Sequence, residues 1–397
     1  MSLPDVLTTI ERLPGRFRPD HLDPITARFR LRVGNVERDV VVDGPRCEIT
    51  EPQDRADVEI ETDVGTWRAI EAGKLSGIEA FAMRKLSIRG SIERSLQFEP
   101  MFERPDNGGM HYSLEHIGRR NSRISALLAG DQGSPPLVLI HGLGATKASW
   151  LTVVPQLAKR HRVVALDLPG FGASAKPIAR YDAKWFAQRV VGALNDLGID
   201  RTFVAGNSMG GRISMELAMS HPDRIEAIAC LCPAAAFSRR PALGLVRFLR
   251  PEAGIVATRL PRGRIVSQLR QLFADPSCVE DSWYDAAVDD FLNVWKSPRA
   301  RISFFASLRN IYLDEPDGEE GFWSRLSRLQ LPALFVYGRR DVLITHHFGK
   351  KIQHNLPRAK VVVWPDCGHV PQIECPERTA DLMTSFFTQA QRKVATA

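Results

Sequence analysis

The sequence has few cysteines and no long apolar stretch. Its six cysteines among 397 residues are widely spaced and form no C-x-x-C pair, which argues against a disulfide scaffold and against a cysteine-paired metal site. No run approaches the roughly 18 apolar residues that a membrane span needs. Pro4 and Asp5 stand where a secretory leader would carry basic and then apolar residues. We therefore expect free thiols, no membrane-spanning helix and a cytoplasmic location.

Neither the charge nor the apolar content is extreme. Hydrophobic residues make up 44% and charged residues 25% of the chain, as in ordinary globular proteins, which excludes a disordered or collagen-like chain. The length suggests two domains, or one large domain with an added module. The net charge of +7 hints at an anionic partner. Because no nucleic-acid-binding motif accompanies the charge, we expect no nucleic acid.

The stretch 104–109, Arg-Pro-Asp-Asn-Gly-Gly, divides the chain into two parts of different character. Its proline and paired glycines are typical of turns and linkers, so we predict a first domain over 1–104, a linker over 105–110 and a second domain over 111–397. Within the first part, 25–42 and 57–61 alternate as β-strands do, and 63–70 has the spacing of an amphipathic helix.

In the second part, apolar strand-like runs alternate with helical patterns. The apolar residues of 182–197 fall on one helical face, with Asp182 as the expected N-cap. Continuous apolar strands separated by helices are typical of a parallel sheet that is covered on both faces. The predicted strands are 137–140, 163–166, 202–205, 227–230, 333–337 and 361–364.

A candidate nucleophile follows the third of these strands. The sequence 206–210 is Gly-Asn-Ser-Met-Gly, and a helical pattern begins directly after it. Glycines on both sides let the chain turn sharply and hold the hydroxyl of Ser208 above the edge of the sheet. We predict that Ser208 is the nucleophile.

A serine hydroxyl needs a base, and the base needs a group that fixes its tautomer. Asp341 and His369 each lie in the loop after a predicted strand, where open α/β sheets place their functional residues. Asp366 is a rival acid, but it is only three residues from the base on the same tight loop. No carboxylate lies between Cys230 and Arg250. We therefore predict Asp341 as the acid and His369 as the base.

Acyl chemistry also needs N–H donors for the developing oxyanion. The sequence 141–144, His-Gly-Leu-Gly, follows the first strand of the second part and supplies a turn in which the amide of Leu143 can face the site. The amide of Met209, directly after the nucleophile, is the second expected donor. We interpret His141 as a residue that holds this loop.

These motifs resemble the α/β-hydrolase fold superfamily over about residues 111–392. The resemblance rests on 141–144, 167–174, 206–211, 338–341 and 367–371, all in the family's order. It implies a mostly parallel, doubly wound sheet with a helical cap, a Ser-Asp-His triad, and no metal or organic cofactor. A serine at the elbow disfavours the epoxide hydrolases and haloalkane dehalogenases, which have an aspartate there.

The cap is expected at about 237–329, where strand-helix alternation is interrupted. Between Arg239 and Arg270 there are eight arginines and one glutamate, interleaved with leucine, isoleucine and phenylalanine. Such an arm suits an anionic membrane surface or an acidic group of a substrate. The alternative is a pair of cap helices with one face packed on the core and a solvated arginine face.

The first domain carries no Ser-His or metal constellation. Its pattern over 56–60, 73–75, 80–81 and 85–90 is similar to the sterol-carrier-protein lipid-transfer domain. That resemblance implies a small α+β fold around an apolar tunnel, with Phe81, Ile92, Leu96, Phe98 and Met101 as candidate lining residues. The pattern fits two other interpretations equally well. These residues are an ordinary hydrophobic core, or the module is a docking or dimerisation surface.

The leading prediction is a serine hydrolase, of esterase or lipase type, for carboxylic esters of lipophilic substrates, with an appended lipid-binding module. The Gly-Asn-Ser-Met-Gly-Gly form also looks like the carbon–carbon bond hydrolases of aromatic ring-cleavage products. Those enzymes usually carry an aromatic residue after the catalytic histidine, where this chain has Val370. Thioester cleavage, or a non-enzymatic lipid carrier with a hydrolase scaffold, also fits the sequence. The sequence indicates neither the acyl length of the substrate nor the oligomeric state of the protein.

Overall fold

The computed structural model describes residues 5–19, 25–53, 55–119, 121–235, 246, 248–256 and 260–395. They form two compact units. We call Met1–Leu114 together with Val279–Asp290 the N-terminal unit, and Glu115–Cys278 together with Phe291–Ala397 the C-terminal unit. The predicted start of the cap at 237 lies outside the described residues, as do four of the eight arginines counted in its first arm.

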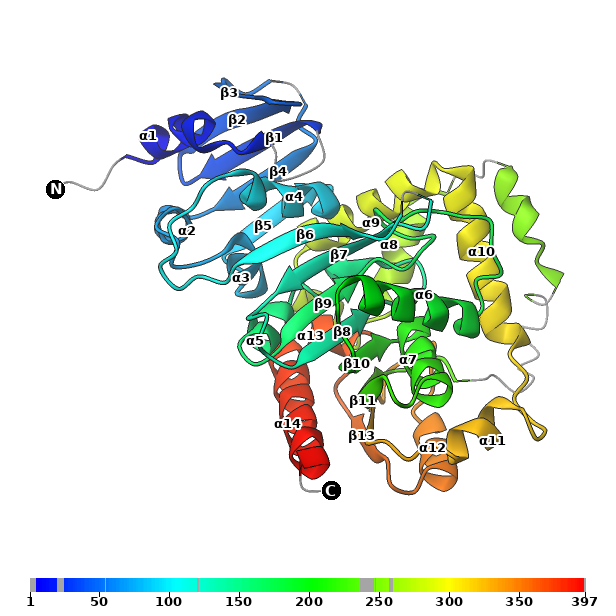
Figure 1. The fold of residues 1–397 in the computed structure, drawn as a ribbon. Helices are drawn as coiled ribbons and strands as arrows, with labels where there is room; N and C mark the ends of the chain where they lie inside the picture. Colours follow the sequence, from blue (N-terminus) through cyan, green and yellow to red (C-terminus); the bar gives the residue numbers. More distant parts are fainter. Residues whose placement is uncertain are drawn as a thin grey trace. The chain divides into compact units, whose positions relative to one another are not determined.

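The N-terminal unit is built on a sheet with the order β3-β2-β1-β4-β5 (Figure 1). Strand β1 pairs antiparallel with β2 and parallel with β4, which makes a mixed sheet. Alternation along β1 buries Phe29, Leu31 and Val33. The strands are β1 Thr26–Val33, β2 Val36–Asp43, β3 Arg46–Thr50, β4 Val58–Thr62 and β5 Leu86–Gly90.

Short helices complete this unit, and three of them, α2, α3 and α4, begin at a side-chain cap. Asp63 accepts a hydrogen bond from the amide of Thr66 and starts α2, and Ser76 and Glu79 form a reciprocal capping box at α3. The helices are α1 Val6–Glu11, α2 Val64–Glu71, α3 Gly77–Ala82 and α4 Ile92–Phe98, with 3-10 turns η1 Leu13–Arg16 and η3 Glu99–Met101.

The segment predicted as a linker folds onto the N-terminal unit. Arg104 donates to the carbonyls of Leu75 and Met110, at 3.0 and 3.1 Å. Asn107 donates to the carbonyl of Ala72. Residues 104–110 therefore form a fixed strap, and the compact unit continues to Leu114.

The C-terminal unit contains an eight-stranded sheet with the order β13-β12-β11-β10-β8-β9-β7-β6. The registered pairs from β13 to β9 are parallel, and β7 joins β9 antiparallel. All six predicted strands are present. The strands are β6 Tyr112–Ile117, which begins in the N-terminal unit, β7 Ile124–Ala129, β8 Pro136–Ile140, β9 Arg162–Leu166, β10 Thr202–Asn207, β11 Ile225–Leu231, β12 Ala333–Gly338 and β13 Lys360–Trp364.

Helices cover both faces of this sheet, α6 and α7 on one and α5 and α14 on the other (Figure 1). Asp182 caps α6 by accepting from the amide of Trp185, as predicted. The helices are α5 Val154–Ala158, α6 Ala183–Asp196, α7 Met209–Ser220, α8 Arg262–Arg270, α9 Asp281–Trp295, α10 Pro298–Leu313, α11 Phe322–Ser327, α12 Phe348–Asn355, α13 Pro371–Glu374 and α14 Pro376–Ala395, with 3-10 turns η4 Lys147–Trp150, η6 Pro251–Ile255 and η7 Pro276–Cys278.

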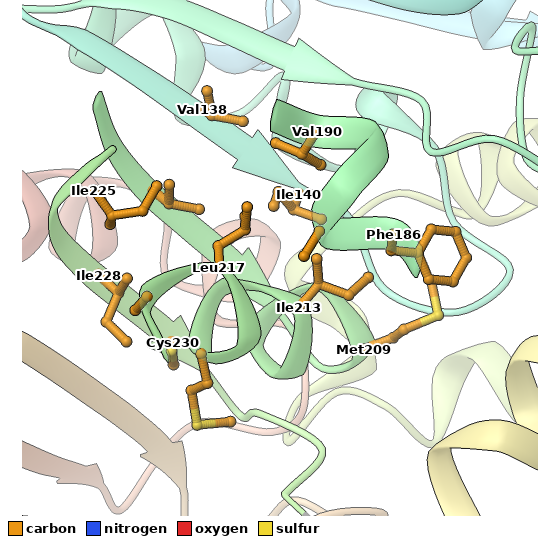
Figure 2. Packing of buried hydrophobic residues seen from close by; sticks show 14 of the residues in the cluster. Val138, Ile140, Phe186, Val190, Met209, Ile213, Leu217, Ile225, Ile228 and Cys230 are labelled. Carbon is orange, nitrogen blue, oxygen red and sulfur yellow. The ribbon is translucent and has the colours of Figure 1, made fainter. Parts of the chain in front are cut away.

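The core of this unit holds α7 rigidly. Figure 2 shows Ile213 and Leu217 of α7 among Val138, Ile140 and other apolar side chains of the central strands. On the opposite face, Phe203 of β10 stacks on Phe387 of α14 with the ring centroids 4.8 Å apart. Because both faces of β10 are packed, the residues after β10 start from a fixed point. In the part of the chain that the structure describes, no helix is both long and apolar enough to cross a membrane.

Candidate active site

Ser208 occupies a sharp turn between β10 and α7. Its backbone has φ 53° and ψ −113°, a conformation that non-glycine residues rarely adopt. A Cβ on Gly206 would lie 2.2 Å from the carbonyl oxygen of Gly210, and a Cβ on Gly210 would lie 2.1 Å from that of Ile140. The predicted strand-turn-helix context is therefore present, and both flanking glycines are needed because no side chain fits there.

His369 and Asp341 lie in direct contact. Nδ1 of His369 is 2.7 Å from Oδ2 of Asp341, and the two side chains are 5% and 0% exposed. The other carboxylate oxygen accepts from the amides of Leu343 and Ile344, each at 2.8 Å. Both oxygens of Asp341 are thus engaged, which fixes the carboxylate and leaves Nε2 as the ring nitrogen directed away from it.

The two loops that carry this pair approach backbone to backbone. A Cβ on Gly338 would lie 2.1 Å from the carbonyl oxygen of Gly368, so glycine at the end of β12 permits the contact. Asp366, the rival acid, pairs instead with Arg378 at 2.9 Å on the surface. The structure brings Asp341, and not Asp366, to the imidazole.

Asn207 joins the nucleophile turn to the histidine loop. Its Nδ2 donates to the carbonyl oxygens of Leu231 and His369, at 3.1 and 3.0 Å, and its side chain is buried. Because Asn207 directly precedes Ser208, these hydrogen bonds hold the serine turn and the histidine backbone together. Ser208, Asp341 and His369 follow β10, β12 and β13, whose carboxyl ends lie at one edge of the sheet.

The predicted oxyanion donors flank Ser208. Met209 is the first residue of α7, and the first amides of a helix have no intrahelical acceptor. On the other side, a Cβ on Gly142 would lie 3.4 Å from Cβ of Ser208. The turn that carries Leu143 therefore lies beside the turn of Ser208, as an oxyanion site requires.

A buried network holds the Leu143 turn. His141 has its Nδ1 2.7 Å from the carbonyl oxygen of Gly142, and its Nε2 accepts from the amide of Leu168 at 3.0 Å. Burial lowers the pKa of His141, which agrees with a neutral ring. Nearby, Nζ of Lys147 lies 2.8 Å from Asp167, and both side chains are fully buried. His141 therefore holds the loop, as we interpreted it.

Part of the cap lies directly on the histidine loop. The amide of His369 donates to the carbonyl oxygen of Leu272 at 2.6 Å. The Glu374 carboxylate accepts from the amide of Ala274 with one oxygen and from that of Gly368 with the other, each at 2.7 Å. Glu374 thus fastens this cap segment to the loop that carries His369.

Aromatic side chains from α9 and α10 lie over the oxyanion turn. A Cβ on Gly144, which has φ +74°, would lie 3.1 Å from Phe304 and 3.4 Å from Phe291. Phe291 stacks on Trp295 with the ring centroids 5.3 Å apart, and Trp295 meets Phe304 edge-on at 5.4 Å. This aromatic wall, Phe291, Trp295 and Phe304, gives the cap side an apolar character.

Cys232 lies beside Asp341 and His369. Its fully buried thiol donates to the carbonyl oxygen of Gly368 at 3.5 Å, and burial together with the nearby Asp341 raises the pKa of the thiol. Potential ligand atoms of Cys232, Asp341 and His369 lie within 4.8 Å of one another. The hydrogen bond between His369 and Asp341 accounts for this cluster, so we assign no metal to it.

The candidate lipid-lining residues lie in and around α4 of the N-terminal unit. Ile92, Leu96, Phe98 and Met101 are buried, and Phe81 on α3 is half-buried. The ring of Phe98 lies 5.1 Å from those of Phe29 and Phe102. Their role as lining residues stays a prediction.

Three residues with contacts at the candidate site, Asn207, Cys232 and Glu374, were not predicted. Asn207 lies inside the nucleophile motif, but nothing in the sequence indicates its carbonyl partners. Cys232 and Glu374 act across the fold, on loops that are distant in the chain. For Cys232, the sequence contains one indication. No carboxylate follows the strand that ends at Leu231, and Cys232 is the residue at that position.

Comparisons with known proteins agree with this geometry. Residues 135–376 match the alpha/beta hydrolase fold family, and residues 9–103 match the SCP-2 sterol transfer family. A membrane phospholipase A of known structure superposes with a TM-score of 0.60 at 30% identity, over 70% of this chain and 87% of that one.

Curated relatives match a similar share of the chain. The dihydrolipoyllysine-residue acetyltransferase component of the acetoin cleaving system of Pseudomonas putida is 34% identical over 65% of this chain and 65% of its own length. The 2-hydroxymuconate semialdehyde hydrolase of Pseudomonas sp. (strain CF600) is 29% identical over 64% of this chain and 87% of its own length. The chain belongs to the α/β-hydrolase fold family, as a hydrolase that carries an SCP-2 sterol transfer domain in its N-terminal part.

Proposed function

We propose that this protein is a serine hydrolase that cleaves carboxylic esters of lipophilic substrates. The observation that carries the proposal is the contact between His369 and Asp341, at the sheet edge where Ser208 stands in a strained turn. A base oriented in this way, beside a serine at an elbow, is the arrangement that nucleophilic acyl transfer needs.

In the proposed mechanism, Nε2 of His369 takes the proton of Ser208 as the oxygen attacks the ester carbonyl. Asp341 holds the tautomer and stabilises the imidazolium. The amides of Leu143 and Met209 stabilise the oxyanion. The alcohol leaves with the proton from His369, and water then attacks the acyl-enzyme with His369 again as base. No metal or organic cofactor enters these steps.

Three observations support a lipophilic substrate. The aromatic wall beside Gly144 offers apolar surface next to the oxyanion turn, and apolar acyl chains gain free energy when they leave water for such a surface. The SCP-2 domain supports a module that binds lipid. The resemblance to a membrane phospholipase A points the same way.

A second candidate is cleavage of a carbon–carbon bond in a ring-cleavage product. The similarity to the 2-hydroxymuconate semialdehyde hydrolase favours it, and it would use the same three residues. Val370 after the histidine favours ester cleavage over carbon–carbon bond cleavage. Turnover of a ring-fission product without cleavage of any ester would reverse the order of the two candidates.

We further propose peripheral contact with an anionic membrane through the cap. Phe248, Ile255 and Val256 are 66%, 61% and 67% exposed, and Arg250 and Arg264 are exposed nearby in the sequence. Exposed apolar side chains flanked by arginine suit a bilayer with acidic head groups. Six free cysteines support a reducing, cytoplasmic location.

Hydrolysis of p-nitrophenyl esters of increasing chain length tests the main proposal. We expect the wild-type protein to prefer longer acyl chains, and Ser208→Ala to lose about 10³-fold or more of kcat. Ser220→Ala, at the far end of the same helix, is the matched control and should keep the wild-type rate. A wild-type protein that cleaves none of these esters, or full activity in Ser208→Ala, would rule the proposal out.

A further inference from the structure

Helix α9 contributes to both compact units. It runs without interruption from Asp281 to Trp295, and the division between the units falls between Asp290 and Phe291. Tyr284, Ala286 and Val288, in its first part, are buried. A helix is stiff along its axis, so a shift of its first part is transmitted to its second part.

Asp290 is fixed to the start of α4. Its Oδ1 accepts from the hydroxyl of Ser91 at 2.6 Å, and its Oδ2 accepts from the amide of Glu93 at 3.1 Å. Charge-assisted hydrogen bonds of this kind are stronger than neutral ones. Helix α4 bears Ile92, Leu96 and Phe98, three of the predicted lipid-lining residues.

The next residue, Phe291, lies over the oxyanion turn. It would meet a Cβ on Gly144 at 3.4 Å and stacks on Trp295. Gly144 is one residue from Leu143, the predicted oxyanion donor. Adjacent residues of one helix therefore contact the start of α4 and the turn beside the nucleophile.

We propose that lipid bound by the N-terminal unit regulates ester hydrolysis at Ser208 through α9, with Asp290 as the positioning residue. The regulation of that site rests on the proposed function. Ile92, Leu96 and Phe98 are 4%, 3% and 9% exposed, so an apolar ligand among them has to displace α4 side chains. When α4 moves, Asp290 moves with it, and Phe291 moves with Asp290.

The coupling is reciprocal. A substrate that moves Phe291 has to change the affinity of the N-terminal unit for lipid by the same factor. The free energy available for this coupling is the difference in the binding free energy of the ligand between the two positions of α4, and it cannot be larger.

The test uses the full-length protein with cis-parinaric acid as the lipid probe and p-nitrophenyl butyrate as the substrate. Probe fluorescence gives the Kd, and kcat and KM are measured against probe concentration. We expect kcat/KM of the wild type to change by about fivefold or more, with its midpoint at the Kd from fluorescence. Asp290→Asn and Ser91→Ala should bind the probe and lose this response. Asn293→Ala, exposed on the same helix, should keep it.

The variants separate regulation from simple competition at the ester site. If Asp290→Asn and Ser91→Ala respond as the wild type does, the probe acts at the ester site and the inference fails. It fails as well if the probe binds without changing the wild-type rate, or if the probe does not bind. Should Asp290→Asn not fold, Ser91→Ala decides alone.

Hydrogen exchange separates this inference from the proposed function. Residues 291–295 should change their exchange when the wild type binds the probe, and should not change it in Asp290→Asn. If the wild type cleaves no ester but shows this change, the proposed function fails and the coupling stands. Unchanged exchange of 291–295 overturns the coupling, whatever the enzyme hydrolyses.

Discussion

At the scale of single residues, Asn207 shows how a neighbour of the proposed nucleophile sets its geometry. The amide group donates to two carbonyls, of Leu231 and His369. An amide side chain serves because each hydrogen of its NH₂ group points to a different oxygen. The turn of Ser208 and the backbone of His369 are therefore held together by hydrogen bonds that do not involve the proposed reacting atoms.

We expect substitutions of Asn207 to lower kcat with little change in KM. Asn207→Ala removes both donors and should lower kcat by about 10- to 100-fold. Asn207→Asp should be worse, because a carboxylate would face two carbonyl oxygens at the same distance. Steady-state kinetics on the best p-nitrophenyl ester measures both variants.

Thermal unfolding of both Asn207 variants is the control for stability. A loss of stability alone would lower the fraction of active protein, but it would not lower the rate per labelled serine. Normalisation by labelling with a fluorophosphonate probe removes that difference. Equal kcat per labelled serine in wild type and Asn207→Ala would contradict a positioning role.

The backbone at Ser208 explains which residues of the motif could be predicted. The requirement for glycine at 206 is local, since its Cβ would strike the carbonyl oxygen of Gly210 within the elbow, and local requirements leave a spacing in the sequence. The Cβ of residue 210 would instead strike the carbonyl oxygen of Ile140 on β8. The partners of Asn207 and Glu374 come from loops far along the chain. Such contacts depend on the sheet order and leave no spacing to recognise.

At the scale of elements, the strap 104–110 replaces the flexible linker that its composition suggests. It is fixed by Glu99, whose Oε2 accepts from the amide of Gly77 at 2.6 Å and whose other oxygen pairs with Arg104. Burial raises the pKa of Glu99 to about 7, although Arg104 opposes this shift. Proline and glycine indicated a turn correctly, but the buried acid that holds the turn could not be inferred from them.

The raised pKa of Glu99 predicts that the N-terminal unit loses stability as the pH rises. Below pH 4.5 the carboxyl is protonated in folded and unfolded chains, and between 4.5 and about 7 the folded state binds the extra proton. Its contribution is therefore complete at low pH and is lost as the pH rises through 7.

Glu99→Gln should remove this dependence, which amounts to about 2–4 kcal/mol between pH 4.5 and 8. Urea unfolding at pH 5 and pH 8, followed by pulsed deuterium labelling of peptides from β1 and β4, measures it in the N-terminal unit. Equal pH slopes in wild type and Glu99→Gln would show that Glu99 is ionised throughout.

Element boundaries were predictable where packing and local chemistry agree. The six strands of the parallel sheet are apolar on both faces, and Asp182 and Asp63 cap the helices that follow them. By contrast, α8 has no buried residue, so a pattern of core-facing residues could not define it. Its neighbour η6 is held instead by Arg301, which donates to the carbonyl of Gly254 at 2.7 Å.

At the scale of the whole molecule, the charge is divided unevenly. Residues 1–104 carry 16 basic and 19 acidic side chains, and the remainder carries 37 against 27. The excess of positive charge thus belongs to the part of the chain that contains the hydrolase fold and its cap. That asymmetry favours an anionic surface as a partner of the cap over a general polyanion.

We expect the protein to bind vesicles of phosphatidylcholine with phosphatidylglycerol, and to bind pure phosphatidylcholine weakly. Ile255→Asp combined with Val256→Asp should reduce partitioning by about tenfold, because it removes exposed apolar surface and adds repulsive charge. Ile178→Asp, at a site that is 85% exposed in another loop, is the control.

Co-sedimentation at low and high salt measures this partitioning. Binding that is unaffected by the double variant, or that is equal on neutral vesicles, would remove the membrane contact from the proposal. Retained hydrolysis of a soluble ester by the double variant would show that the site itself is intact.

The composition of the N-terminal unit also bears on the order in which the chain folds during synthesis. Residues 279–290 belong to this unit, yet at about 5–20 residues per second they are made roughly 9 to 35 seconds after residue 114. Until Asp290 has left the ribosome, Ser91 and the amide of Glu93 have no carboxylate to bind. The first domain to be translated is therefore completed only after residues 115–278 of the other unit have been made, and a nascent chain that stops before residue 279 carries the SCP-2 sequence without residues 279–290 of its unit.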